Sequence, residues 1–211
     1  MKILSIETTS ELSGTAFLED GEILSEYSFK TADAAGSLIR HIDTVLKDSH
    51  CRPVELDLIT VSAGPGLWTG IRLGMGAAKG LAAAFKTRIY CVGAAESLFF
   101  AVKEFKMPAF CVVNAYRGKI HLSYFNGKFS YKGYTTKTVD AGEIHEMCRK
   151  KKVLLTGPGI SILPEKTKKL KTVTIPAKKL LYPQAGTNAL LAVEKIKRDV
   201  PSLPMNPYYG R

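Results

Sequence analysis

The feature that most constrains the fold is a repeated order of expected elements, marked in each half by one Asx-Gly pair. Asp20-Gly21 and Asn126-Gly127 each stand between two strand-like segments, and such pairs are strong signals of a β-hairpin. The first half predicts strands at 3–7, 14–19 and 23–29, a helix at 33–49, a strand at 56–62 and a helix at 71–85. After a linking strand at 88–92 and helix at 95–102, the second half predicts strands at 109–114, 119–125 and 128–135, a helix at 141–151, a strand at 153–156 and a helix at 186–198. We therefore expect a structural duplication.

A duplicated β-β-β-α-β-α unit predicts an α/β fold with two lobes, which is the plan of the actin, Hsp70 and sugar-kinase (ASKHA) superfold. We expect residues 1–108 to form an N-terminal lobe that binds a partner. Residues 109–211 would form a basic C-terminal lobe with the closing helix at 186–198. Nucleotide binds between the two lobes in that superfold, but a fold alone does not give a function.

Two short loops are candidates for binding phosphate. The first, with Thr8 and Ser10, follows the first strand. The second runs from a strand into a helix and contributes Gly64, Gly66, Thr69 and Gly70. Glycines let such a loop turn tightly while amides at the start of the helix face an anion. The same pattern also fits a tight connection with close packing, so the residues leave both interpretations open.

Four segments resemble the TsaB (YeaZ) family. The run G-P-G-L-W-T-G-I-R-L-G at 64–74 is similar to that family's G-P-G-S-F-T-G-L-R-I-G, and A-K-G-L-A follows it in both. The opening I-L-S-I-E-T-T-S resembles I-L-A-I-D-T-S, N-A-Y-R-G at 114–118 resembles D-A-R-R-G, and the final P-Y-Y-G-R resembles P-x-Y-L-R. These landmarks span the whole chain in the family's order.

The resemblance implies a non-catalytic subunit for the threonylcarbamoyladenosine (t6A) modification of adenosine 37 in tRNA. Such a subunit scaffolds and activates a TsaD-type transferase as a heterodimer, and a TsaE-type ATPase joins the larger complex. It implies no cofactor and no metal in this chain, tRNA contact through the complex, and a homodimer when the partner is absent. The rival hypothesis is an independent ATP-binding or ATP-hydrolysing enzyme of the same superfold.

The residues themselves favour the non-catalytic interpretation. The catalytic relative holds a metal through an H-x-x-x-H pair, whereas none of the four histidines here lie four apart. Acids that follow the first strand of each lobe help hold the metal in nucleotide-hydrolysing members of the superfold. Here these positions carry Glu7 and the neutral Asn114. We expect Glu7 to accept hydrogen bonds from the loop that follows it.

The expected partner interface lies on the first two helices. The resemblance implies that they pack against the equivalent pair of TsaD as a four-helix bundle, although Ala34–Ser37 departs from the His-Ser-Glu that relatives often carry there. Small residues at spacings of three and four would let a partner helix approach closely, but the same stripe could instead pack inside its own lobe. The expected contact residues are Leu38, Ile42, Leu46, Arg72, Gly74, Ala78, Lys79 and Ala82.

The net charge of +11 is concentrated in the second half of the chain. Residues 1–110 carry −2 and residues 111–211 carry +13. Lysine runs such as Lys150, Lys151 and Lys152 could attract RNA over long range, or could form a solvated surface. The first residues lack the pattern of a signal peptide, and no apolar segment has the roughly 18 residues of a membrane span, so we expect a cytoplasmic protein.

Overall fold

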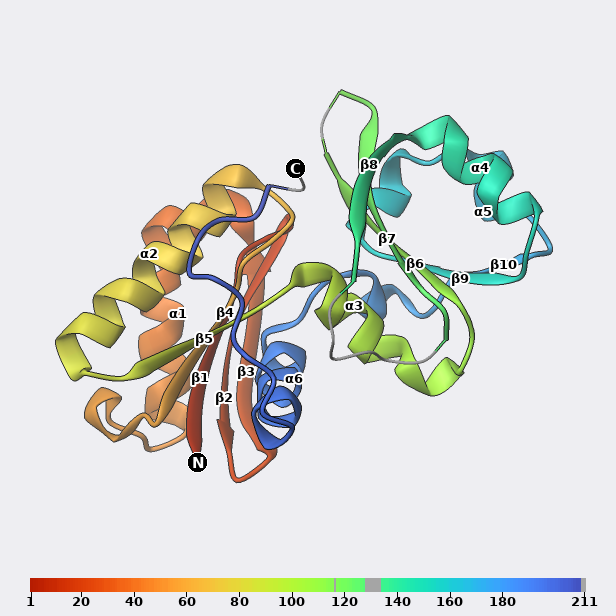
Figure 1. The fold of residues 1–211 in the computed structure, drawn as a ribbon. Coiled ribbons are helices and arrows are strands. Elements are labelled where there is room, and N and C mark those ends of the chain that lie inside the picture. The colour runs from red at the N-terminus through yellow and green to blue at the C-terminus, as the bar shows by residue number, and fades with distance from the viewer. Residues whose placement is uncertain (116, 128–133, 210–211) are drawn as a thin grey trace.

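The computed structural model describes residues 1–115, 117–127 and 134–209, and it contains two five-stranded mixed sheets with helices packed on them (Figure 1). The strand order of the first sheet is β3-β2-β1-β4-β5 and that of the second is β10-β9-β6-β7-β8. In each lobe three strands are joined in antiparallel pairs and the others are parallel. The predicted duplicated α/β plan is confirmed.

The first sheet begins with the predicted meander. Asp20 and Gly21, both with positive φ, form the hairpin turn, and Glu19 pairs with Glu22 beside it. The strands are β1 (Lys2–Glu7), β2 (Leu12–Glu19), β3 (Glu22–Lys30), β4 (Leu58–Ser62) and β5 (Arg88–Val92). Because β1 lies in the middle of the sheet, both of its faces are buried, and its side chains belong to two different cores.

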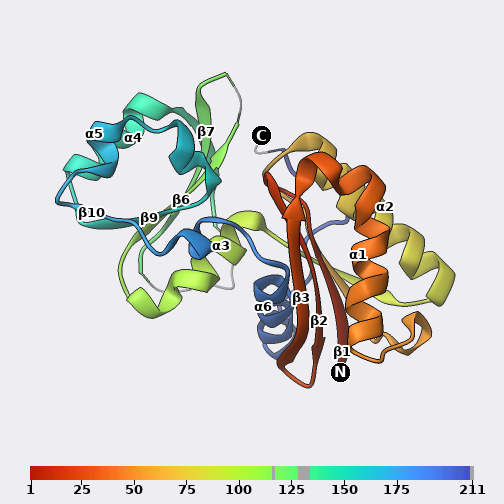
Figure 2. The ribbon, with the colours of Figure 1, turned by 180° about the vertical axis from the view of Figure 1, so that it is seen from behind.

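Two helices cover one face of the first sheet. They are α1 (Ala34–Asp48) and α2 (Trp68–Phe85), which lie next to each other in Figure 2. Their apolar stripes meet the side chains of Leu4, Ile6 and Phe17 in one core. The short helices η1 (Thr31–Asp33) and η2 (Pro53–Glu55) flank α1.

The second sheet consists of β6 (Ala109–Asn114), β7 (Lys119–Phe125), β8 (Thr136–Asp140), β9 (Val153–Thr156) and the short β10 (Val173–Thr174). Most of the predicted strand at 128–135 lies outside the described residues, which resume at residue 134, and the next strand that the structure describes is β8. One face of this sheet packs against α4 (Ala141–Arg149) and the segments after β9. Those segments are η4 (Pro158–Ile162), α5 (Glu165–Lys168) and η5 (Lys178–Leu181).

The remaining two helices are exchanged between the lobes. Helix α3 (Ala94–Val102) follows the first sheet in sequence but packs most of its apolar residues against the second, and η3 (Lys103–Phe105) follows it. Helix α6 (Ala185–Lys197) ends the second half of the sequence but covers the free face of the first sheet, against Ile3 and Leu18. In space, each lobe therefore contains one helix from the other half of the sequence. The predicted boundary between residues 108 and 109 stays a prediction.

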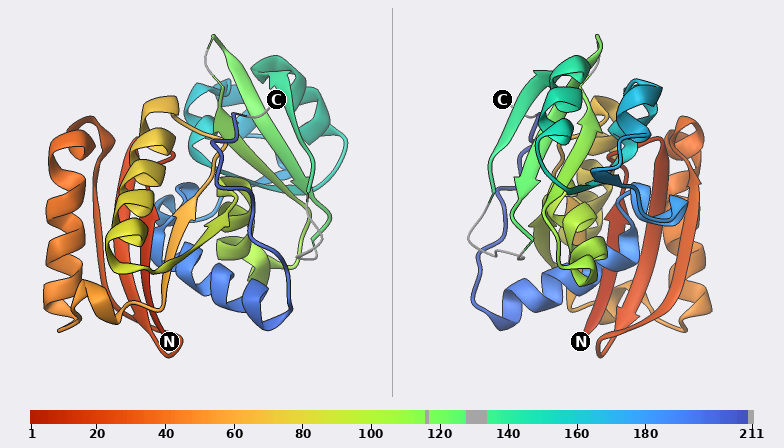
Figure 3. Two further views of the ribbon diagram at one scale, coloured as in Figure 1. Left: turned by 60° about the vertical axis from the view of Figure 1, so that its left-hand side comes forward. Right: turned by 90° about the vertical axis from the view of Figure 1, so that its right-hand side faces the viewer.

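The segment after α6 returns along the first lobe, as the dark-blue trace in Figure 3 shows. Leu203 N donates to the carbonyl oxygen of Cys91 at 3.2 Å, and Tyr208 N donates to that of Ala63 at 2.8 Å. These bonds run beside β5, an edge strand, and reach the end of β4. Residues 200–209 therefore form a C-terminal strap that is part of the first lobe.

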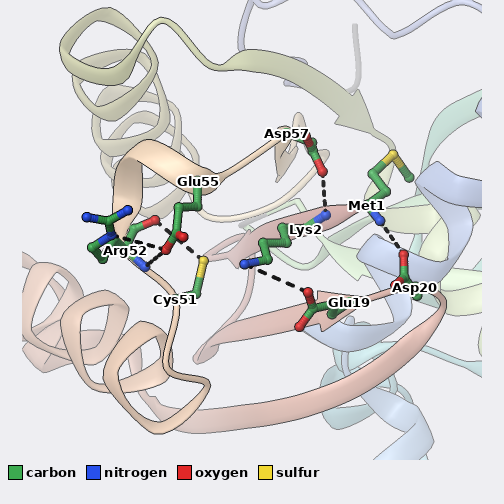
Figure 4. Close-up of polar contacts among 8 residues, drawn as sticks. All are labelled: Met1, Lys2, Glu19, Asp20, Cys51, Arg52, Glu55 and Asp57. Atoms are coloured by element: carbon green, nitrogen blue, oxygen red, sulfur yellow. Dashed lines mark hydrogen bonds and ion pairs between the residues drawn. The ribbon is translucent and has the colours of Figure 1, made fainter.

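The opposite end of the first lobe is closed by polar contacts around the N-terminus (Figure 4). The Met1 ammonium pairs with Asp20, Lys2 N donates to Asp57 Oδ2 at 2.7 Å, and the Lys2 ammonium lies 3.8 Å from Glu19. The two ion pairs are partly exposed to solvent, so each contributes little to stability. In the described part of the chain, no helix combines the length and the apolar character that crossing a membrane requires.

Candidate functional site

The first candidate loop is organised around the buried carboxylate of Glu7. Glu7 Oε1 accepts hydrogen bonds from Thr9 N at 2.6 Å and from Thr9 Oγ1 at 2.5 Å. Its other oxygen accepts one from Asn188 Nδ2 of α6 at 2.9 Å. Burial raises the pKa of Glu7, and these hydrogen bonds oppose that rise. The prediction that Glu7 binds the loop that follows it is confirmed.

The second candidate loop packs directly on the first. A Cβ on Gly66 would lie 2.0 Å from the carbonyl oxygen of Thr9, and a Cβ on Gly70 would lie 1.9 Å from that of Thr8. Leu67 N donates to the Thr9 carbonyl at 2.7 Å, and Thr8 Oγ1 donates to the Gly70 carbonyl at 2.7 Å. The backbone of the first loop therefore occupies the space that these glycines leave.

Of the remaining residues predicted for the two loops, Gly64 packs against backbone as Gly66 and Gly70 do, whereas Ser10 and Thr69 lie outside that contact. Gly64 has φ +102°, and a Cβ there would lie 2.4 Å from the carbonyl oxygen of Tyr208 in the strap. Ser10 Oγ donates to the Leu12 carbonyl at 2.9 Å, and Thr69 is exposed on the first turn of α2. Of the two interpretations of the glycine loop, close packing accounts for every glycine in it.

The second lobe repeats this loop, which the sequence reasoning missed. Gly157-Pro158-Gly159-Ile160 follows β9 just as Gly64-Pro65-Gly66-Leu67 follows β4. A Cβ on Gly157, at φ +115°, would lie 2.1 Å from the carbonyl oxygen of Val112. The repeated Gly-Pro-Gly, followed in each lobe by a branched apolar residue, is the signal in the sequence that could have revealed it. It indicates that the tight turn belongs to the duplicated architecture.

The four histidines lie in four separate places. His41 of α1 stacks on Phe29, with ring centroids 4.1 Å apart. His121 bonds Thr138 across the second sheet, and burial lowers its pKa. His145 bonds Thr167, and His50 follows α1. Within the described ranges, no cluster of three or more His, Cys, Asp or Glu side chains could hold a metal ion.

The structure places most of the predicted interface residues inside the first lobe. Five of them are buried: Leu38, Ile42, Leu46, Gly74 and Ala78. Their regular spacing marks the helix faces that pack on the sheet of their own lobe. Arg72 and Lys79 are exposed, and Ala82 is half-buried. A partner that docks on the folded lobe can therefore touch only the last three. The location of the interface stays a prediction.

The outward faces of α1 and α2 carry a different set of residues. Ile39 is 61% exposed. Gly76 and Gly80 of α2 are exposed, with no atom of another part of the chain within 4 Å of a Cβ built on either. Glycine inside a helix costs about 1 kcal/mol relative to alanine. Neither glycine is required by packing within this chain.

An aromatic cluster adjoins this outward face at the start of α2. Trp68, which is 47% exposed, stacks on Tyr209 of the strap with centroids 4.4 Å apart. Arg72 Nε donates to the Tyr209 hydroxyl at 3.0 Å, and its guanidinium lies 5.5 Å from the Trp68 ring. The end of the strap thus contributes to the same surface as α2.

The predicted RNA-contact lysines lie at the edge of the second lobe, after α4. Lys150 and Lys152 are exposed, and the Lys151 ammonium lies 3.9 Å from the ring centroid of Tyr124. Tyr124 is itself exposed. The sequence alone shows no aromatic residue among these lysines, because Tyr124 belongs to β7 and is distant from them in the sequence.

Comparisons with known proteins agree with this architecture. The chain is 29% identical over 133 residues to the tRNA threonylcarbamoyladenosine biosynthesis protein TsaB of Bacillus subtilis, a match that covers 63% of this chain and 56% of that protein. The chain therefore spans little more than half the length of that relative. The model of the family TsaD, tRNA N6-adenosine threonylcarbamoyltransferase, matches residues 33–197. The chain belongs to this family, in its TsaB (YeaZ) group.

Solved structures place this TsaB-type chain in the same fold. YeaZ from Pseudomonas aeruginosa superimposes with a TM-score of 0.79 at 18% identity, over 99% of both chains. The ROK hexokinase from Thermus thermophilus superimposes with a TM-score of 0.53 at 12% identity, over 93% of this chain and all of the hexokinase. The predicted relation of this TsaB-type chain to the actin, Hsp70 and sugar-kinase superfold is confirmed at the level of the fold.

Proposed function

We propose that this chain is a non-catalytic subunit in the biosynthesis of threonylcarbamoyladenosine in tRNA, where it scaffolds and activates a TsaD-type transferase. The observation that carries the proposal is the filling of the first lobe's glycine loop by the carbonyl groups of Thr8 and Thr9. A loop that held phosphate at the start of a helix would need free backbone amides, and a metal beside it would need free carboxylates. Here Gly66 and Gly70 meet backbone instead.

The charge pattern supports the same proposal. Both oxygens of Glu7 already accept hydrogen bonds from within the chain, and the corresponding position of the second lobe carries Asn114. A hard divalent cation prefers several carboxylate oxygens, so this pair is poorly suited to one. The names of the relatives point to the t6A reaction, and the geometry favours a supporting role in it.

The outward faces of α1 and α2 are the surface that we assign to the transferase. Two helices presented side by side suit the packing of a second pair against them. The glycines at 76 and 80 would let a partner helix approach α2 closely, and Ile39 offers an apolar contact. Arg72 and Lys79 border this surface. When the transferase is absent, the same surface would pair two copies of this chain.

The remaining partners follow from the proposed complex. A TsaE-type ATPase would join the heterodimer, and tRNA would contact it partly through Lys150 and Lys152 of the basic lobe. Such a complex would act in the cytoplasm. This chain would need no cofactor of its own, because the transferase and the ATPase would supply the chemistry.

A reconstitution with the TsaD-type transferase of the same cell tests the proposal. The expected result is a heterodimer by size-exclusion chromatography and t6A formation that requires this chain. Gly76→Arg should abolish the heterodimer, because a long charged side chain would stand where a partner helix packs. The matched control is Gly142→Arg, a glycine of α4 that is also exposed and also has nothing within 4 Å.

Two results would overturn the proposal. One is micromolar ATP binding with turnover by the purified chain alone, which would make it an enzyme. The other is t6A formation at an unchanged rate when the chain is omitted. If Gly76→Arg and Gly142→Arg both retained the heterodimer, the interface would lie away from the outward face of α2.

A further inference from the structure

A cavity of about 660 Å³ lies between the strap and the second lobe, apart from the closed loops. The strap forms one wall, and the end of β4, the first turn of α3, the end of α6 and the segment that enters β8 form the others. A volume of this size accommodates a small organic molecule. The lining residues that matter to its chemistry are Glu96, Tyr134, Lys195, Pro204, Asn206 and Tyr208.

The charged groups of the cavity form one buried ion pair where the two exchanged helices cross. Lys195 Nζ of α6 donates to Glu96 Oε1 of α3 at 2.8 Å, and the two side chains are 2% and 1% exposed. Burying two charges in an apolar surrounding costs stability unless they are paired and hydrogen-bonded. The pair therefore fixes two charged side chains at the wall of an otherwise largely apolar space.

The two members of this ion pair differ in how much of their hydrogen-bonding capacity is used. Both carboxylate oxygens of Glu96 are used, Oε1 by Lys195 and Oε2 by Gly93 N at 3.0 Å. An ammonium group has three N–H donors. Within the described part of the chain, Glu96 is the one hydrogen-bond partner of Lys195 Nζ. The cavity thus offers buried donors to a ligand that brings an acceptor.

The charge of the pair selects against charged ligands. A carboxylate or phosphate placed on Lys195 would lie beside the Glu96 carboxylate, and a cation placed on Glu96 would lie beside the ammonium. Like charges at close range in a buried site are strongly unfavourable. A carbonyl or hydroxyl oxygen can accept from Lys195 without that cost.

The remaining residues that line the cavity favour a ligand that contains a ring. Three prolines of the strap provide rigid apolar surface, and Tyr134 and Tyr208 line the cavity from the second lobe and from the strap. Burial raises the pKa of Tyr134 well above its usual value, so its hydroxyl is neutral. Aromatic side chains bind planar rings by stacked or edge-to-face contact.

We infer that this cavity is a binding site for a neutral, ring-containing small molecule whose carbonyl or hydroxyl oxygen accepts a hydrogen bond from Lys195. The ligand would touch the strap, α3 and α6 at once and so would bridge the two lobes. None of the described residues that line the cavity belongs to α1 or α2, so the inference does not require the transferase.

Three probes of matched shape test the inference on the full chain. They are indole-3-acetamide, which is neutral, indole-3-acetate, an anion, and tryptamine, a cation. We expect the amide to bind at least fivefold more tightly than either charged probe, as measured by calorimetry and by chemical-shift changes at Glu96, Tyr134 and Lys195. Absence of amide binding, or equal affinity for all three probes, would overturn the inference.

Two variants locate the binding. Asn206→Trp places a large ring in the cavity from an exposed position of the strap and should reduce amide affinity at least tenfold, whereas Lys197→Trp, exposed on α6 outside the cavity, should not. The double variant Glu96→Gln, Lys195→Met removes the ammonium without leaving a lone charge, so it should fold and lose the preference for the amide. Retained affinity in Asn206→Trp and in the double variant would show that the probe binds elsewhere.

Discussion

Glu7 and Asn188 are 181 positions apart in the sequence, yet their side chains share a hydrogen bond of 2.9 Å in the interior of the first lobe. The bond joins the end of the first strand to the last helix. The carboxylate therefore links local loop geometry to the closure of the fold.

The first prediction concerns the pH dependence of stability. Burial raises the pKa of Glu7 above its ordinary value of 4.5, so the folded chain binds the Glu7 proton more tightly than the unfolded chain does. The contribution of Glu7 to the free energy of unfolding is therefore greatest below pH 4.5. It falls as the pH rises toward the raised pKa, at a rate of up to about 1.4 kcal/mol per pH unit. Glu7→Gln cannot ionise and should lack this fall. Urea unfolding of both chains from pH 4 to pH 8 measures it, and parallel curves would contradict the prediction.

The second prediction compares two glycines of the same helix. Gly70→Ala should destabilise the chain by about 3 kcal/mol or prevent folding, because the new Cβ would lie 1.9 Å from a backbone carbonyl oxygen that cannot easily move. Gly76→Ala should stabilise the isolated chain by up to about 1 kcal/mol, because its Cβ meets nothing. Thermal and urea unfolding give both values. Equal effects of the two substitutions would show that the loops do not pack as described.

The third prediction concerns the buried ion pair. Lys195→Met alone and Glu96→Gln alone should each destabilise the chain, with Lys195→Met costing about 3–5 kcal/mol because it leaves a buried carboxylate unpaired. The double variant should be less destabilised than the sum of the single variants. A double-mutant cycle of unfolding free energies measures the coupling. Simple additivity would mean that the two groups do not interact.

The fourth prediction concerns tRNA. Replacing Lys150 and Lys152 by glutamate should weaken tRNA binding by the assembled complex and reduce the dependence of log K on log salt, because fewer counterions would be released. Lys151 is left in place, since its ammonium lies over Tyr124. The control replaces Lys30 and Lys86 of the first lobe, both exposed. If the variant with glutamate at positions 150 and 152 bound tRNA with an unchanged salt dependence, Lys150 and Lys152 would belong to a surface that is solvated and does not contact tRNA.

The sequence predicted most of the strands because their signals are local. The bounds of β5, β6, β7 and β9 match the predicted ranges, since alternating or β-branched runs end there at turn residues or at the start of a helix. The hairpin at Asp20-Gly21 was predicted for the same reason. The short β10 was not, because two residues carry no periodicity.

The candidate site was predicted less well because its geometry depends on distant contacts. Periodicity shows that Leu38 and Ile42 share one face of α1 and that Ala78 belongs to the small-residue face of α2, but not whether these faces meet the chain's own sheet or a partner. The carbonyls that fill the glycine loop come from a segment far away in the sequence. Likewise, no local pattern joins Glu96 to Lys195 or Tyr124 to Lys151.

The exchange of α3 and α6 has a consequence for how the chain is made. A ribosome releases the N-terminal half first, but the free face of the first sheet, with Ile3 and Leu18, is covered by residues 185–197. During synthesis that face stays exposed to water and to other nascent chains, and such transient apolar surfaces promote aggregation. The lobe that begins synthesis is therefore the last to be completed, and chaperones that hold nascent chains would be expected to meet it in that state.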